Sequence, residues 1–229
     1  KRSWVHLASR VTISLRLALL LTRWIMDRED NLNPLPVIVP EGPAKNFVSH
    51  VLDVWDDDIQ VRKAHSKKSQ DPEIDIFSFE ASSGVTEVWS SGKVKISACK
   101  VRHEPVCPAV GYRIESQDGV VAISGDTLVC DEVAELAEGA DVLIYEAMRF
   151  EAIESLPQKR QFILDYHADT RLIGAQAKEI GVETLVLTHL IPEPFSEEDR
   201  QAFIGDIREG GFTGELIVAE DLDSVVLEK

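Results

Sequence analysis

Four short phrases place ionisable residues where a predicted strand or hairpin ends. They are VRHEPVCPAVGYRI with His103, ISGDT with Asp126, DYHADT with His167 and LVLTH with His189. Sheet folds collect their sites at strand ends, because the loops converge there while the sheet holds them rigid. Imidazoles and a carboxylate that meet at one point suit a borderline divalent ion such as zinc. The sequence therefore predicts a metal site at one edge of a sheet.

Each of these residues also fits an ordinary structural role when it is taken singly. A lone histidine is more often a surface or satisfied side chain than a ligand, and His6, His50 and His65 are assigned that role. Asp126 in SGDT fits a cap on the following turn. Glu146, at the end of DVLIYEA, fits a solvated strand terminus. None of these signals is specific by itself.

The first half of the chain is expected to form short strands and hairpins. Apolar runs bounded by Gly, Pro and Asp-Gly turns carry this expectation. The predicted elements are strands over 35–42 and 73–81, a helix from Pro43 to about Trp55, and hairpins over 86–104 and 110–127 that turn at 90–92 and 118–119.

In the second half, helix and strand are expected to alternate. The predicted elements are helices over 130–140, 169–181 and 196–211, strands over 141–147 and 183–189, and a final strand pair around 215–228. Asp169 or Thr170 caps the second helix and Gly181 ends it, while Ser196 begins the third. Hairpins first and strand–helix alternation later indicate an α/β (α+β) protein with helices covering its sheets.

The composition suits one soluble domain with a sizeable core, since 44% of the 229 residues are hydrophobic. Lys plus Arg number 24 against 40 Asp plus Glu, a net charge of −16. Such an acidic surface repels phosphate backbones, which disfavours broad nucleic-acid binding. The cysteines Cys99, Cys107 and Cys130 form no CxxC pair and leave an odd one over. That pattern fits reduced thiols in a cytoplasmic protein.

The N-terminal residues combine a basic start with a short apolar run. Only five residues, Leu17 to Leu21, separate Arg16 from the Thr22-Arg23 pair, and no small-residue cleavage site follows. These features argue against a signal peptide and against a membrane span. Residues 15–28 are instead predicted to form an amphipathic helix packed on a core.

The order HEPVCPAVGYRI, ISGDT, ADVLIYEAM, YHADT, LVLTHLIP resembles the metallo-β-lactamase fold hydrolases, particularly their ribonuclease Z-like branch. The likeness runs from about residue 15 to the C-terminus. It implies a four-layer αββα sandwich, one domain over residues 1–229 with an atypical start at 1–14, and a site for two zinc ions at the edge of the sheets. Tyr145 departs from the branch, which often has His before the Glu of this phrase.

The resemblance also implies a role for each candidate residue. His103 would ligate one metal ion, Asp126 would bridge both, and His189 would ligate the second. His167 resembles the proton donor to the leaving group, and Glu146 the carboxylate that orients it. Two zinc ions that share a hydroxide stabilise both oxygens of an in-line displacement, and a carboxylate-held His then supplies the proton.

One hallmark of the family does not match this chain. The family carries an upstream HxHxDH, which provides most of the metal ligands and the catalytic base. Here the corresponding stretch reads VHLASRVTISL, in which His6 fits the first position while Ala8, Arg10 and Val11 occupy the others. No Asp or Glu precedes Asp27, so no shifted register restores the motif. We therefore expect little or no bound metal and impaired or absent activity.

Three explanations of this departure compete. We favour a truncated or mis-translated reading of an ordinary enzyme gene, because five basic residues and no acid before residue 27 contrast with the acidic remainder. A degenerate, non-catalytic scaffold or binding protein is the second explanation. Rescue by His6, His50 or His65 as substitute ligands ranks last, because His50 and His65 fall in segments expected to be helix or loop.

The expected substrate is a small-molecule phosphodiester or other ester. The resemblance includes transfer-RNA 3′-processing enzymes, but the bacterial ones carry an inserted arm between the positions of His103 and Asp126. Here a plain hairpin crosses that gap, and tRNA binding needs a basic footprint that this acidic chain lacks. A homodimer through helix 15–28 is a further candidate, with core packing as the alternative role of that helix.

Overall fold

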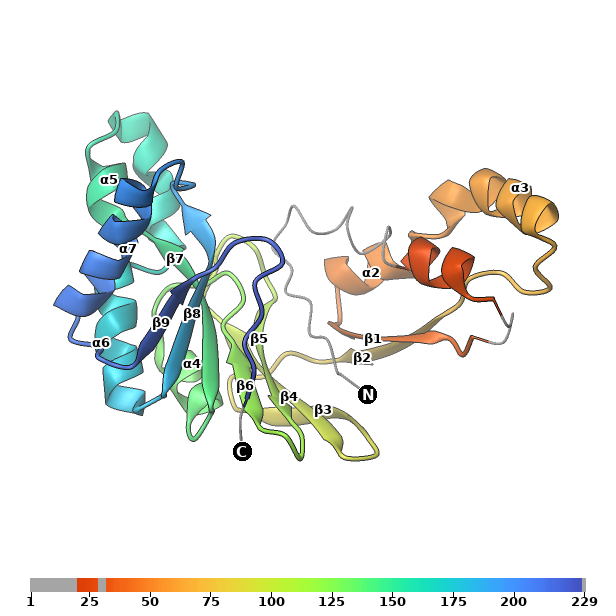
Figure 1. Cartoon of the computed structure of the whole chain (residues 1–229), viewed down its shortest axis with the longest axis horizontal. Helices are drawn as coiled ribbons and strands as arrows, with labels where there is room; N and C mark the ends of the chain where they lie inside the picture. The colour runs from red at the N-terminus through yellow and green to blue at the C-terminus, as the bar shows by residue number, and fades with distance from the viewer. Residues whose placement is uncertain (1–19, 29–31, 228–229) are drawn as a thin grey trace. The chain divides into compact units, whose positions relative to one another are not determined.

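The computed structural model describes residues 20–28 and 32–227, and the chain divides into two units, Lys1–Glu80 and Ala81–Lys229 (Figure 1). The atypical start at 1–14 and His6 lie outside the described residues. The predicted helix over 15–28 is described only in part, and it is helical over residues 20–26. The expectation of one domain over residues 1–229 stays a prediction.

The first unit is built on a pair of parallel strands. β1 (Leu35–Pro40) pairs with β2 (Ile74–Phe79), with Leu35 opposite Ile74 and Pro40 opposite Phe79. Between them come α2 (Pro43–His50), η1 (Asp53–Trp55) and α3 (Asp56–Ser66). The buried apolar residues of this unit are Leu20, Trp24, Val39 and Ile59.

The helix α3 was not expected from apolar spacing, and its charges explain why it forms. Three acidic residues, 56–58, occupy its first turn, and Lys63 and His65 lie in its last turn. Both sets complement the helix dipole, and Arg62 and Asp58 add an ion pair at i,i+4 spacing. A search for apolar periodicity alone overlooks such a helix.

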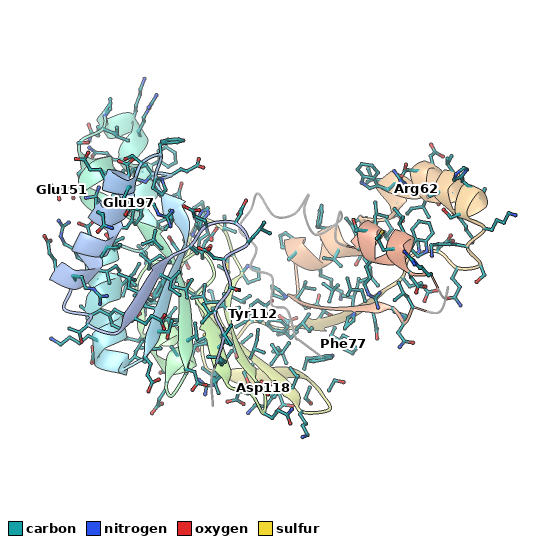
Figure 2. The ribbon with its side chains drawn as sticks, in the orientation of Figure 1. Arg62, Phe77, Tyr112, Asp118, Glu151 and Glu197 are labelled. Atoms are coloured by element: carbon teal, nitrogen blue, oxygen red, sulfur yellow. The ribbon has the colours of Figure 1, made fainter. Side chains whose placement is uncertain are left out.

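The second unit contains one sheet of seven strands in the order β3-β4-β5-β6-β7-β8-β9. The strands are β3 (Thr86–Ser91), β4 (Val94–Val101), β5 (Ala109–Glu115), β6 (Val120–Ile123), β7 (Val142–Met148), β8 (Thr184–Ile191) and β9 (Glu215–Val218). Pairs from β3 to β6 are antiparallel and pairs from β6 to β9 are parallel. The predicted hairpins and the predicted mixed sheet are thus present, and Figure 2 labels Tyr112 on β5 and Asp118 in the β5–β6 turn.

Three helices cover one face of this sheet (Figure 1). They are α4 (Asp131–Ala137), α6 (Thr170–Ile180) and α7 (Glu197–Glu209). α4 packs on β4 to β6, α6 on β7, and α7 on β9, with α6 between its two neighbours. Two elements that were not expected, α5 (Phe150–Glu154) and η2 (Gln158–Asp165), fill the connection from β7 to α6.

The core lies between the sheet and these helices. Leu143, Leu185 and Leu187 project from β7 and β8 and are fully buried, as are Ile173 of α6 and Ile207 of α7. β7 is buried along its whole length, as is typical of a central strand in a parallel arrangement. The strand that carries Glu146 is therefore the most completely buried strand of the unit.

The helix termini follow the sequence signals closely. Asp169 accepts a hydrogen bond from Arg171 N, and Gly181 ends α6 in the left-handed conformation. Ser196 and Asp199 form a capping box at the start of α7. These caps confirm the predicted boundaries of both helices.

The predicted final strand pair is wrong in its second member. β9 is present, but residues 219–227 form no strand, and Leu222 is fully exposed. β9 takes the edge position beside β8, and the apolar residues after it reach no partner strand. Among residues 20–28 and 32–227, no helix combines the length and the apolar character needed to cross a lipid bilayer.

Candidate active site

The sequence-predicted site residues gather at one end of the seven-stranded sheet. His103 follows β4 and Asp126 follows β6. Glu146 and His189 lie near the carboxyl ends of β7 and β8. His167 comes from the loop between η2 and α6. Because β6, β7 and β8 are parallel neighbours, their carboxyl ends meet at this edge.

Three imidazole rings form the centre of the cluster. The ring centroids of His103 and His167 are 5.2 Å apart, and those of His167 and His189 are 5.4 Å apart. His189 Nε2 lies 3.8 Å from Asp126 Oδ2. His103 and His167 are buried, so the imidazoles meet where little water competes for them.

Glu146 contacts the cluster through its buried carboxylate. Its Oε1 lies 2.9 Å from His167 Nδ1 and accepts backbone hydrogen bonds from Thr127 N at 3.0 Å and Ala168 N at 3.1 Å. Its Oε2 is buried and has no hydrogen-bond partner among the described residues. Burial raises the pKa of Glu146 well above its usual value, although the Thr127 N–H opposes that shift. The alternative role of Glu146 as a solvated strand terminus is excluded, since its side chain is 1% exposed.

The loop that carries His167 is tied to β7 by its backbone. Ala168 N donates to the Glu146 carboxylate, and Ala168 O accepts from Met148 N at 2.8 Å. These two hydrogen bonds reach β7 at Glu146 and at Met148, the residues on either side of Ala147. The backbone directly after His167 is therefore attached to β7.

The tautomer of His103 follows from its hydrogen bond. His103 Nδ1 lies 2.8 Å from the carbonyl oxygen of Tyr166, and a carbonyl only accepts. The proton is therefore on Nδ1, which leaves the Nε2 lone pair to accept a proton or bind a metal ion. Metal-binding histidines commonly have this kind of support.

His189 owes its position to a bulge in β8. Glu146 pairs with Thr188 and Ala147 pairs with Leu190, so His189 is an extra residue in the ladder. Its φ is 48°, a left-handed value that a residue other than glycine rarely adopts. At this bulge the imidazole faces Asp126 at the site, near the carboxyl end of β8.

The SGDT phrase forms the turn that carries Asp126 to the site. Ser124 Oγ accepts from Glu146 N and donates to Gly125 O. Gly125 has a φ of 67°, and a Cβ there would lie 2.5 Å from Val110 O. This position therefore requires glycine, and the tight turn places Asp126 beside β7 and β8. Of the residues that build the site, sequence reasoning missed Ser124 and Thr127, although both lie in the motif it singled out.

His50, His65 and Tyr145 take ordinary structural roles. His50 and His65 are exposed on α2 and α3 in the other unit, where they match the surface role assigned to them. Tyr145 donates from its hydroxyl to Gln176 Oε1 at 3.0 Å on the helix-covered side. Glu146 points to the other side of the strand, so Tyr145 contributes to the core.

The described residues do not complete a metal site by themselves. His103, Asp126 and His189 offer nitrogen and oxygen donors of the kind that zinc takes. Within residues 20–28 and 32–227, however, no group of three or more His, Cys, Asp or Glu side chains is placed to hold one metal ion. The donor set thus fits a metal ion only in part.

Comparison with known proteins identifies relatives of both the sequence and the fold. Residues 35–190 match the family described as beta-lactamase superfamily domain. The chain is 35% identical over 210 residues to ribonuclease Z of Mycobacterium bovis (strain BCG / Pasteur 1173P2), covering 90% of this chain and 72% of the relative. Ribonuclease Z of Mycobacterium tuberculosis (strain H37Rv) is 34% identical, covering 90% and 74%.

Two solved structures share the fold. Human tRNase Z, short form, superposes with a TM-score of 0.61 at 18% identity, covering 93% of this chain and 73% of that one. The metallo-beta-lactamase fold protein YhfI of Bacillus subtilis gives 0.57 at 19% identity, covering 95% and 73%. At these identities the likeness concerns the fold alone.

Proposed function

Because the chain belongs to the beta-lactamase superfamily, and its relatives are ribonuclease Z proteins, we propose that it is a ribonuclease Z-like hydrolase of a small phosphodiester or other ester. The observation that supports this proposal is the buried contact between His167 and Glu146 inside the cluster of three imidazoles. A histidine held by a carboxylate is the arrangement that general acid catalysis needs.

The proton-transfer step is assigned to His167. Its Nδ1–H is engaged with Glu146 Oε1, so the proton that moves is the one on Nε2. When the ester bond breaks, that proton passes to the departing oxygen and His167 becomes neutral. The contact with Glu146 Oε1 fixes the orientation of the ring before and after the transfer. Glu146 is thus a positioning residue.

Metal binding by this chain is proposed to be incomplete. His103, Asp126 and His189 are the residues that would contact zinc. The positions that correspond to the rest of the family motif hold Ala8, Arg10 and Val11, which lie outside the described residues. None of those side chains is a usual zinc ligand, and the Arg10 guanidinium adds a like charge. We infer that zinc is held substoichiometrically and that hydrolysis is impaired.

Two alternatives remain to be separated by experiment. Relatives named ribonuclease Z, together with the resemblance to transfer-RNA 3′-processing enzymes, favour an endoribonuclease of that kind. Against it stand the net charge of −16 and the short connection between β5 and β6, which spans only residues 116–119. The absence of the family motif favours a non-catalytic scaffold.

A single purified preparation tests all three functions. Zinc content is measured by mass spectrometry before and after incubation with excess zinc, and hydrolysis of bis(p-nitrophenyl) phosphate and cleavage of a precursor tRNA are followed in parallel. We expect less than one zinc per chain and slow, zinc-stimulated diester hydrolysis. Two tightly held zinc ions would contradict impaired metal binding. Diester hydrolysis that stays absent at saturating zinc would indicate the scaffold, and efficient precursor cleavage would indicate the nuclease.

A variant pair then tests the assigned roles. His167→Ala should slow diester hydrolysis by about 10²- to 10⁴-fold, the usual contribution of a general acid, without changing zinc content. His189→Ala should lower zinc content. If His167→Ala removed the zinc instead, His167 would be a ligand and the assignment of the proton would be wrong.

A further inference from the structure

A row of aromatic rings leads from the three imidazoles to the surface. Tyr166 is at its centre, with ring centroids 4.9 Å from His167 and 5.1 Å from His103. Phe162 continues the row, 6.3 Å from Tyr166 and tilted by 46°. Both belong to η2 and its C-terminal boundary, the segment that the sequence did not predict. The row thus connects the proton donor to η2.

Phe162 is 59% exposed, although it is a large apolar ring. A single exposed apolar residue needs no explanation in general. Phe162 differs because its ring contacts Tyr166, which in turn contacts two of the clustered histidines. It therefore presents an uncovered aromatic surface at the rim of the site.

The charge of the same turn suits an anionic ligand. Lys159 and Phe162 are three residues apart in η2, and side chains at i and i+3 of a 3₁₀-helix lie on the same side. Lys159 is exposed, in a chain where acidic residues outnumber basic ones by 40 to 24. An ammonium beside an aromatic ring is the combination that binds a phosphate ester with a planar group.

We propose that Phe162 and Tyr166 form a stacking platform that selects esters whose leaving group carries a planar aromatic ring, such as a nucleobase or an aryl group. This inference deepens the proposed function and rests on it for the place of the phosphoryl group. Since His167 protonates the departing oxygen, the group attached to that oxygen lies next to Tyr166. A ring on that group would meet Tyr166 first and extend from there toward the exposed ring of Phe162.

Binding measurements test the platform without requiring turnover. Methyl phenyl phosphate and dimethyl phosphate have the same charge and differ only in the aromatic ring. Ligand-observed NMR titration of each, with and without added zinc, should show that the phenyl ester binds about tenfold tighter, the size typical of stacking on an aromatic side chain. Phe162→Ala should remove that gain and leave dimethyl phosphate binding unchanged. Phe162→Trp should preserve the gain.

Leu172→Ala is the matched control. Leu172 is 55% exposed on α6, so its replacement removes a similar apolar group from the same unit. It should alter neither affinity. Equal affinity of the wild type for the two diesters would overturn the platform and leave the proposed function standing, because the phosphoryl group would still bind. If neither diester bound at any zinc concentration, the diester class itself would be wrong and the platform would fall with it.

Discussion

His167 Nδ1 lies 2.9 Å from Glu146 Oε1, and the same carboxylate oxygen accepts two backbone N–H groups. One atom of a buried side chain thus fixes three elements: the turn after β6, the strand β7 and the loop before α6. The catalytic assignment and the local fold depend on the same carboxylate. Replacements that keep its oxygen should therefore behave differently from those that remove it.

Replacing Glu146 by Gln or Ala separates these two dependencies. Glu146→Gln retains a carbonyl oxygen that accepts from Thr127 N and Ala168 N. Glu146→Ala leaves both N–H groups buried without a partner, at about 1–3 kcal/mol each. We expect the free energy of unfolding, measured with denaturant, to fall by at least about 2 kcal/mol more in Glu146→Ala than in Glu146→Gln. Equal losses would mean that water replaces the carboxylate.

The tautomers of His103 and His167 give a second prediction. The Nδ1 atoms face a carbonyl oxygen and a carboxylate oxygen, respectively, and both partners accept hydrogen bonds. When neutral, both rings should therefore carry their proton on Nδ1. An exposed histidine lacks a fixed acceptor of this kind, so its tautomer is not set in this way. Nitrogen-15 NMR of selectively labelled protein measures the two tautomers. An Nε2-protonated ring at His103 would remove the lone pair that the proposed metal contact needs.

The left-handed backbone of His189 should cost stability. A residue with a Cβ costs about 1–2 kcal/mol more than glycine at such a φ. We expect His189→Gly to be about 1 kcal/mol more stable than His189→Ala in denaturant unfolding. Leu222, with a φ of 76° and a fully exposed side chain, gives the control pair Leu222→Gly and Leu222→Ala. A gain at Leu222 without one at His189 would mean that the bulge relaxes when the imidazole is removed.

Gly125 allows strain and collision to be separated. Its φ is 67° and a Cβ would lie 2.5 Å from Val110 O, whereas Gly92 has a φ of 59° and nothing within 4 Å. Gly92→Ala should therefore cost only the strain, about 1 kcal/mol. Gly125→Ala should cost clearly more, and it should shift Asp126 away from His189. Thermal unfolding of both variants measures the difference, and equal melting temperatures would show that β5 yields to the new methyl group.

The sequence predicted most of the second unit because its signals are local. Capping residues such as Ser196 and glycines such as Gly181 act within one helical turn. Apolar strands can be recognised from their composition. His103, Asp126 and His189 were found for a related reason, since each stands near the end of a strand, whereas His167 lies in the loop before α6. Their grouping depended on the sheet order, which a single sequence supports only through resemblance.

What could not be predicted depends on contacts between distant residues. The Tyr166 carbonyl that orients His103 lies 63 residues away in the sequence. The segment η2 has too little apolar periodicity to be predicted as a helix. The bulge at His189 arises from pairing with β7, so its left-handed φ has no signature in LVLTH. The unpaired segment after β9 looked like a strand because it is apolar, but a strand also needs a neighbour.

The three cysteines differ in their exposure to solvent. Cys99 and Cys130 are buried and Cys107 is exposed. Burial raises the pKa of Cys99 to about 12 and also raises that of Cys130, so neither forms a reactive thiolate near neutral pH. A disulfide-exchange reagent at pH 8 should therefore titrate one thiol in the folded chain and all three in denaturant. Cys107→Ser should abolish the fast reaction, and a second fast thiol would show that the core opens readily.

The raised pKa of Cys99 should make the folded protein less stable at high pH. Between the ordinary thiol pKa of 9.0 and the folded value of about 12, the folded state keeps the Cys99 proton that the unfolded state releases. Stability therefore falls as pH rises through this window, by at most about 1.4 kcal/mol per pH unit from this group. Cys99→Ala removes the group, so its unfolding free energy should decline less steeply than that of the wild type from pH 9 upward. Parallel curves would mean that the Cys99 thiol ionises as easily in the folded protein as in the unfolded chain.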